Sequence, residues 1–84
     1  MTSVPEPIRI ETGTRWDAVD LARRLAAHHT YLVQLGDRRW HVCVRDEDPA
    51  ELLPTVRAAA QRWAEDRHLA ATLRCAGETY ELSG

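Results

Sequence analysis

The stretch that decides the fold comprises residues 30–45, which read TYLVQLGDRRWHVCVR. Apolar and polar side chains alternate on both sides of Gly36-Asp37, a pair of residues that tolerates the positive φ of a tight hairpin turn. We therefore predict two antiparallel strands, one over residues 30–35 and one over residues 38–45.

The expected turn also predicts the register of this hairpin. A two-residue turn places Val33 opposite Trp40. It also places Tyr31 opposite Val42, so these four side chains should share the buried face. The other face of the hairpin then carries Leu32, Gln34, Arg39, His41 and Cys43.

A strand and a helix are expected before the hairpin. Residues 8–11 alternate apolar and polar side chains, which is typical of a half-buried strand. Thr14 followed three positions later by Asp17 is a variant of the capping box that opens helices. Apolar side chains at helical spacing then predict a helix over residues 15–29.

A second helix and a second hairpin are expected after the first hairpin. Asp48 and Pro49 are suited to the N-cap and first position of a helix, and Pro54 predicts a kink inside it. Residues 70–75 and 78–82 flank a second tight turn and predict two more strands. The pairs expected between these two strands are Ala71 with Leu82, Thr72 with Glu81, Leu73 with Tyr80, and Arg74 with Thr79.

The predicted order of elements is β-α-β-β-α-β-β, which is an α+β fold. We expect residues 1–7 to form a loose N-terminal arm and residues 8–84 to form a single domain. With right-handed crossovers, the topology resembles the ferredoxin-like (split βαβ) sandwich. With the strands numbered along the chain, the expected order in the mainly antiparallel sheet is 5-4-1-3-2. Both helices should cover one face of the sheet.

The composition is that of an ordinary globular domain. The chain has 84 residues, of which 29% are charged and 44% hydrophobic, with a net charge of −2. This balance argues against a disordered chain and against nucleic-acid binding by the whole surface. No apolar run is long enough to cross a membrane and no signal peptide is recognisable, so we expect no membrane association.

Missing residue types exclude several kinds of chemistry. All 11 basic residues are Arg, and the chain contains no Lys, Asn or Phe. Without Lys, a Schiff-base lysine and a phosphate-binding loop of the GK[ST] type are excluded. The serines Ser3 and Ser83 both lie in expected tails, which argues against a serine nucleophile. Lys, Asn and Phe have AT-rich codons, whereas the abundant Ala and Arg have GC-rich codons. This codon bias suggests a GC-rich bacterial source.

The two cysteines, Cys43 and Cys75, indicate reduced thiols in the cytoplasm, because small secreted domains usually carry more cysteines. The strand assignment places them on opposite faces of the sheet, which argues against a disulfide. His41 and Cys43 share one face, where nearby Arg side chains would lower the thiol pKa. A flat sheet face lacks the orienting group and oxyanion hole of a nucleophilic site, so we expect no catalytic residues and no enzymatic activity.

No metal or cofactor is expected. His28 and His29 end the first predicted helix, where His is favoured by the helix dipole, and adjacent helical residues diverge too far to chelate. The acidic run 46–48 precedes the second helix, where negative charge is stabilising, and it lacks the alternating ligands of a calcium loop.

The face of the sheet without helices is the candidate functional surface. The simplest interpretation is a solvated face with weak cross-strand ion pairs. Three functional interpretations compete with it. The side chains expected there are Arg9, Glu11, Leu32, Gln34, Arg39, His41, Cys43, Arg45, Thr72, Arg74, Thr79 and Glu81.

Self-association or docking of a protein partner is the function we favour from sequence. Leu32, Cys43 and the aliphatic stems of Arg39 and Arg45 would form the centre of a patch. The second and fifth strands lie at the edges of the sheet and are open to pairing. A small domain also gains stability from a homodimer.

Binding of a small anion is the alternative, as in a ligand-sensing regulatory domain. Gly13 permits a sharp turn before the first helix, whose N-terminal N–H groups attract anions. Arg15 is adjacent, and Arg39, Arg45 and Arg74 supply positive charge on the open face. Gly13 otherwise serves only to shape the turn.

Nucleic-acid binding is the third interpretation, and the expected register disfavours it. Readers of RNA that use a sheet face stack bases on aromatic side chains. Tyr31, Trp40 and Tyr80 are all expected on the opposite, covered face.

Trp16 falls outside the buried stripe of the first helix. We expect it to pack on Val19 and on the arm of residues 1–7. If exposed, Trp16 would be the strongest candidate for an interaction hot spot, because Trp contributes heavily to interface energy.

Overall fold

The computed structural model describes residues 6–84, so most of the arm predicted over residues 1–7 lies outside it. Five strands and two helices follow one another in the predicted order. The strands are β1 (Ile8–Thr12), β2 (His29–Gly36), β3 (Arg39–Arg45), β4 (Ala70–Cys75) and β5 (Glu78–Ser83). The helices are α1 (Arg15–Arg24) and α2 (Pro49–Arg67).

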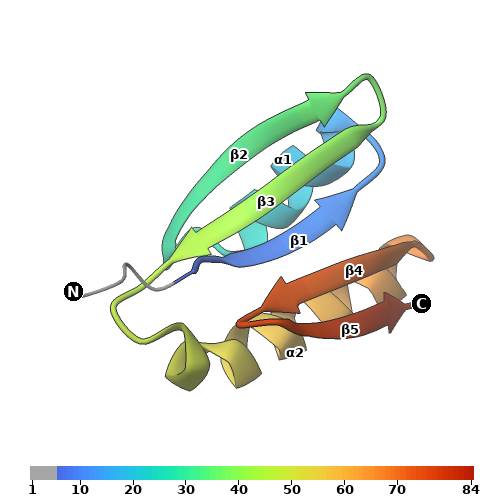
Figure 1. Cartoon of the computed structure of the whole chain (residues 1–84). Helices are drawn as coiled ribbons and strands as arrows, with labels where there is room; N and C mark the ends of the chain where they lie inside the picture. The colour runs from blue at the N-terminus through green and yellow to red at the C-terminus, as the bar shows by residue number, and fades with distance from the viewer. Residues whose placement is uncertain (1–5) are drawn as a thin grey trace.

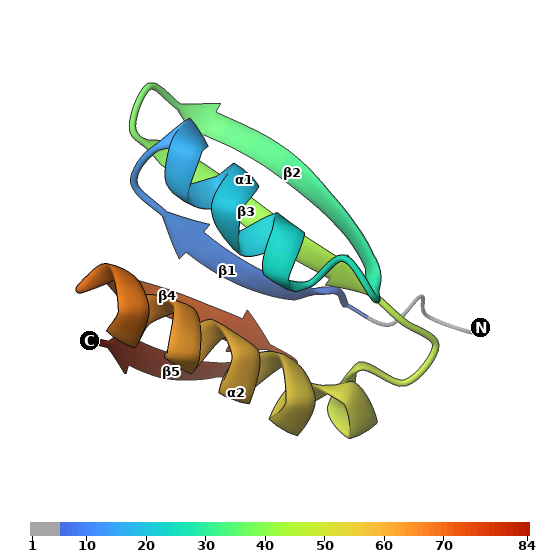
Figure 2. The same cartoon turned by 180° about the vertical axis from the view of Figure 1, so that it is seen from behind.

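The strands form one sheet in the order β2-β3-β1-β4-β5, and every neighbouring pair is antiparallel. Read from the other edge, this is the predicted order. Both helices lie on the same side of the sheet (Figures 1 and 2). The arrangement is that of a ferredoxin-like sandwich with β5 added beside β4, and the predicted fold class is confirmed.

Helix α1 begins as predicted and ends earlier than predicted. The backbone N–H of Asp17 donates to Oγ1 of Thr14 at 3.1 Å, which is the expected cap. The helix ends at Arg24, although the pattern predicted a helix as far as residue 29. His29 instead opens β2 opposite Arg45, because pairing with β3 stabilises an extended chain there. The prediction that His28 and His29 end the first helix is therefore wrong.

Helix α2 begins at Pro49 with Asp48 as N-cap, as predicted. It runs without interruption past Pro54, which the sequence predicted to kink or divide it. The helix ends at Arg67, and the left-handed conformation of the C-cap residue His68 (φ 53°) terminates the helical path. The N–H of Leu69 then donates to the carbonyl of Ala64 at 3.0 Å.

The β2–β3 hairpin differs from its predicted register by one residue. Gly36 pairs with Arg39 around a turn at positions 37 and 38. A bulge between Gln34 and Gly36 then leaves Leu35 unpaired. Because side chains alternate across a strand, one extra residue moves every preceding side chain of β2 to the opposite face.

Four predicted placements on β2 are therefore wrong. Val33 pairs with His41 on the open face, and Gln34 pairs with Trp40 on the side of the helices. Leu32 pairs with Val42 on the helix-covered face, where it packs against the core and not on the open face. Tyr31 pairs with Cys43 on the open face. The predicted pairs of Val33 with Trp40 and of Tyr31 with Val42 do not form.

The β4–β5 hairpin has the register that the sequence predicted. Leu73 pairs with Tyr80 and Arg74 with Thr79. Ala76 (φ 51°) and Gly77 (φ 81°) form the turn, and both adopt the positive φ that a tight hairpin of this kind requires. No bulge interrupts this pair of strands, so the alternation expected from the turn holds along both of them.

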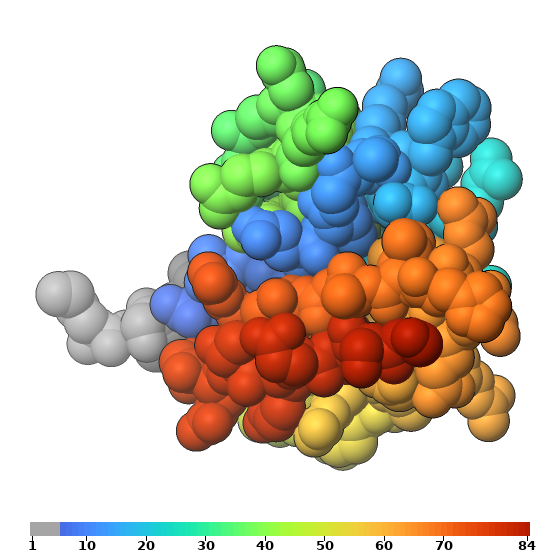
Figure 3. Space-filling model, turned by 90° about the vertical axis from the view of Figure 1, so that its right-hand side faces the viewer, coloured from blue at the N-terminus to red at the C-terminus, as the bar shows by residue number. Residues whose placement is uncertain are grey.

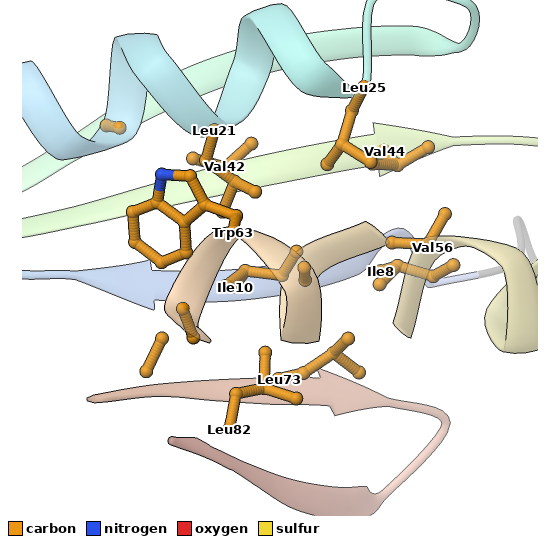
Figure 4. Close-up of a cluster of buried hydrophobic side chains, with 14 of the residues drawn as sticks. Ile8, Ile10, Leu21, Leu25, Val42, Val44, Val56, Trp63, Leu73 and Leu82 are labelled. Carbon is orange, nitrogen blue, oxygen red and sulfur yellow. The ribbon is translucent and has the colours of Figure 1, made fainter. Parts of the chain in front are cut away.

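The core lies between the sheet and the two helices (Figure 4). Its largest fully buried side chains are Trp63, Ile8, Ile10, Leu21, Leu25, Leu73, Leu82, Val42, Val44 and Val56. Trp63 of α2 points toward α1, and its Nε1–H donates to Oδ2 of Asp20 at 3.0 Å. Arg67 pairs with the same carboxylate and with Asp17, each at 3.3 Å. These contacts join the two helices.

Replacing Trp63 should show how much this junction contributes. Trp63→Phe removes the indole N–H and part of the buried volume, so we expect a loss of about 1–3 kcal/mol in the free energy of unfolding. Trp16→Phe is the matched control, and since Trp16 is exposed its effect should stay within about 0.5 kcal/mol. Urea denaturation measures both, and equal losses would contradict the assignment.

Candidate interaction surface on the open sheet face

No helix or strand of residues 6–84 lies over the face of the sheet opposite the helices (Figure 1). Strand pairing aligns its side chains in two rows that cross the whole sheet. One row contains Tyr31, Cys43, Arg9, Arg74 and Thr79. The other contains Val33, His41, Glu11, Thr72 and Glu81. Each row therefore begins with an apolar or aromatic side chain at β2, passes Cys43 or His41 at β3, and is charged or polar on β1, β4 and β5.

Strand β2 presents the apolar end of these rows. Tyr31 is 37% exposed, Val33 36% and Leu35 46%. We call these three side chains the β2 patch. Sequence reasoning missed them because the bulge at Leu35, which turns Tyr31 and Val33 outward, has no signal in the alternation of the sequence. Trp40 and Tyr80 do pack against the covered core, as predicted.

Cys43 lies beneath this patch and is only 2% exposed. Burial raises the pKa of its thiol, and the Tyr31 hydroxyl and the Arg9 guanidinium lower that pKa by less. The expectation that nearby Arg would lower the thiol pKa is therefore wrong in its net direction. Cys43 is a protonated, covered thiol at neutral pH, which is the state of a packing residue.

His41, Glu11 and Arg39 form a small charged group beside Cys43. Arg39 Nη2 lies 3.0 Å from Glu11 Oε1, and His41 Nε2 lies 3.5 Å from the same oxygen. The hydrogen bond from Arg39 is the main reason that the pKa of Glu11 falls below its ordinary value of 4.5. The charge of Arg39 is thus already balanced within the sheet.

The other arginines of the face have different surroundings. Arg45 lies over the ring of Tyr31, at 5.5 Å from its centroid. Arg74 pairs directly across from Arg9, so two positive side chains are neighbours. Arg9 has an acidic neighbour in Glu6 at 3.8 Å. The cluster of arginines predicted from sequence is therefore divided among separate contacts.

The proposed anion site at the start of α1 is not assembled as one group. Gly13 lines a hollow of about 200 Å³ that Arg15 does not reach. Glu11, Glu81 and Arg38 line the same hollow, so two carboxylates oppose one guanidinium and the balance of charge disfavours an anion. The side chain of Thr14 already accepts a hydrogen bond from the first turn of the helix.

Trp16 is 81% exposed, so the prediction that it packs down on Val19 is wrong, and most of the N-terminal arm, its other expected contact, lies outside the described residues. It borders a hollow of about 280 Å³ with Val19, Asp20, Arg23 and Arg67. The acidic side chain there is already paired with Arg67.

Comparison of the chain with models of protein families, with curated proteins and with solved structures finds no match. Within residues 6–84, no three His, Cys, Asp or Glu side chains are grouped so that they could hold a metal ion. Neither helix of this part of the chain is both long enough and apolar enough to span a membrane. Any inference about function therefore depends on the geometry of the surface.

Thiol labelling tests the state of Cys43. Burial raises the pKa of both Cys43 and Cys75, so a disulfide reagent near pH 7 should label each at least about tenfold more slowly in the native protein than in urea. Single Cys→Ser variants identify which thiol reacts. Fast labelling of native Cys43 alone would reveal an activated nucleophile and would contradict this description.

The Glu11 group predicts a dependence of stability on pH. Because the folded pKa of Glu11 lies below 4.5, its carboxylate stabilises the fold above that pH, and this contribution is lost as pH falls through the folded pKa. Glu11→Gln should therefore lower the free energy of unfolding at pH 6–7 by less than about 1 kcal/mol, since the pair is partly exposed. The difference in free energy of unfolding between the wild type and Glu11→Gln should disappear in acid. It should also shrink when both proteins carry Arg39→Gln. A difference that grows in acid would contradict the stabilising role of the Glu11 carboxylate.

Proposed function

We propose that this chain is a non-catalytic interaction domain that self-associates through the β2 edge of its sheet. The observation that carries the proposal is the contrast between the two edge strands. Strand β2 extends over eight residues and contains no Asp, Glu, Lys or Arg, whereas the six residues of β5 include Glu78 and Glu81. Natural proteins protect free edges with charged side chains, so an uncharged, partly apolar edge favours pairing.

A second copy of the chain is the partner that β2 fits best. Antiparallel pairing about a two-fold axis at Leu32 places Tyr31 opposite Val33 of the second copy, on the open face. Aromatic and β-branched side chains stabilise such cross-strand pairs. An uncharged strand brings no like charges together when it pairs with itself. The same axis places the two Leu32 side chains opposite each other on the covered face.

The surroundings of Cys43 and His41 support a binding role. The thiol is covered, its pKa is raised, and His41 is directed to Glu11 and not to sulfur. Both cysteines are free and buried, which suits a reducing compartment, and we extend the proposal to a bacterial cytoplasm.

A different protein that supplies a free strand would pair with the same β2 edge through the same backbone hydrogen bonds.

A charge on the β2 patch should separate the subunits. Val33→Lys places an ammonium group at the centre of the proposed interface, so we expect the dissociation constant of the dimer to rise at least about tenfold. Thr79→Lys is the matched control, because it adds the same charge to the open face of the other edge strand. Sedimentation velocity and native mass spectrometry over a range of concentrations measure the change, and circular dichroism verifies the fold.

The outcomes distinguish the edges. A wild-type dimer that dissociates only in Val33→Lys supports the proposal. Dissociation in Thr79→Lys alone would assign the interface to β5. A wild-type protein that remains at 9.5 kDa at every concentration contradicts self-association.

A further inference from the structure

A second candidate site lies at the opposite edge of the sheet, between α2 and β5. A hollow of about 600 Å³ opens there. Figure 3 shows β5 lying beside α2 along this side of the molecule. The hollow is lined by Leu53, Pro54, Arg57, Ala58, Gln61 and Tyr80. Its volume is within the range of sites that bind small molecules.

Arg57 supplies the charge of this hollow. Its guanidinium lies over the ring of Tyr80, 4.3 Å from the centroid, and stacking of this kind holds the planar group in a defined orientation. No carboxylate lines the hollow, and Arg57 makes no ion pair with any residue of the described part of the chain. The N–H groups at the edge of a stacked guanidinium can bind a carboxylate through two parallel hydrogen bonds.

The remaining walls are mostly apolar. Leu53, Pro54 and Ala58 form the α2 side, and Tyr80 forms the β5 side. Gln61, the other polar residue, is already engaged, because its Nε2 donates to the carbonyl of Ser83 at 2.8 Å and to Glu65 Oε1 at 3.1 Å. One oriented positive charge therefore lies next to the apolar side chains of Leu53, Pro54 and Ala58.

We infer that this hollow binds a small carboxylic acid with an apolar body, such as an aryl or branched-chain carboxylate. The carboxylate pairs with Arg57 and the body lies against Leu53, Pro54 and Ala58. Charge complementarity decides the class, since Arg57 is the one charged side chain among residues 6–84 that lines the hollow. This site is at the β5 edge and does not depend on self-association through β2.

Phenylacetate and its neutral amide, phenylacetamide, test the inference as a matched pair. Chemical-shift titration of the ¹⁵N-labelled protein should show saturable shifts at α2 and β5 with phenylacetate. The amide should bind at least about tenfold more weakly, because it lacks the charge that pairs with guanidinium. Arg57→Gln should weaken phenylacetate by at least about tenfold. Arg62→Gln removes a charge elsewhere on α2, outside the hollow, and should change affinity by less than about twofold.

Three results would overturn the inference: no shifts at α2 and β5 up to the solubility of phenylacetate, equal binding of acid and amide, or unchanged affinity in Arg57→Gln. A capped peptide ending in Phe, compared as free acid and amide, supplies a further arm. If its free acid binds about tenfold more tightly than phenylacetate, the ligand is a chain terminus and not a small acid. The Val33→Lys variant should bind phenylacetate like the wild type. Binding at the hollow can therefore be tested even if the protein does not self-associate.

Discussion

The contact between Trp63 and Asp20 is the interaction on which the two-layer architecture depends. Helix α1 is ten residues long, and only Ala18 and Leu21 of it are fully buried. The indole of Trp63 extends from α2 to α1, and Asp20 satisfies its buried N–H. Arg67 then pairs with the carboxylates of both Asp17 and Asp20. In a domain this small, one large side chain shared by both helices provides much of the core.

With both helices held on one side, the other face of the sheet remains uncovered. The composition of its two cross-strand rows changes from one edge of the sheet to the other, while Arg39 and Arg45 of β3 lie outside these rows. Tyr31 and Val33 meet the covered Cys43 and His41 at one end, and the charged side chains of β1, β4 and β5 occupy the other. Stability therefore arises on the helix side, while Tyr31 and Val33 at the apolar end of the open face contribute little to the core.

The two edge strands of the sheet also differ in charge. Strand β2 has no charged side chain and offers its backbone to another strand. Strand β5 carries two Glu and lies beside a hollow in which Arg57 stacks on Tyr80. One edge thus suits pairing with an identical chain, and the other suits a ligand that combines an apolar body with negative charge. The two sites are separated by the width of the sheet (Figure 1).

The sequence by itself determined the order of the elements, the caps at Thr14 and Asp48, the strand order and the register of the β4–β5 hairpin. The elements, caps and register follow from alternation, capping and turn residues that lie close together in the chain, and the strand order follows from the element order and right-handed crossovers. Only the tertiary structure decided the end of α1, the exposure of Trp16 and the hollow beside Arg57, because each depends on contacts between distant segments. It also decided the bulge at Leu35, which places Tyr31 and Val33 outside and Leu32 inside. A single extra residue reverses the faces of a strand, and the alternation of β2 is compatible with either result until β3 pairs with it.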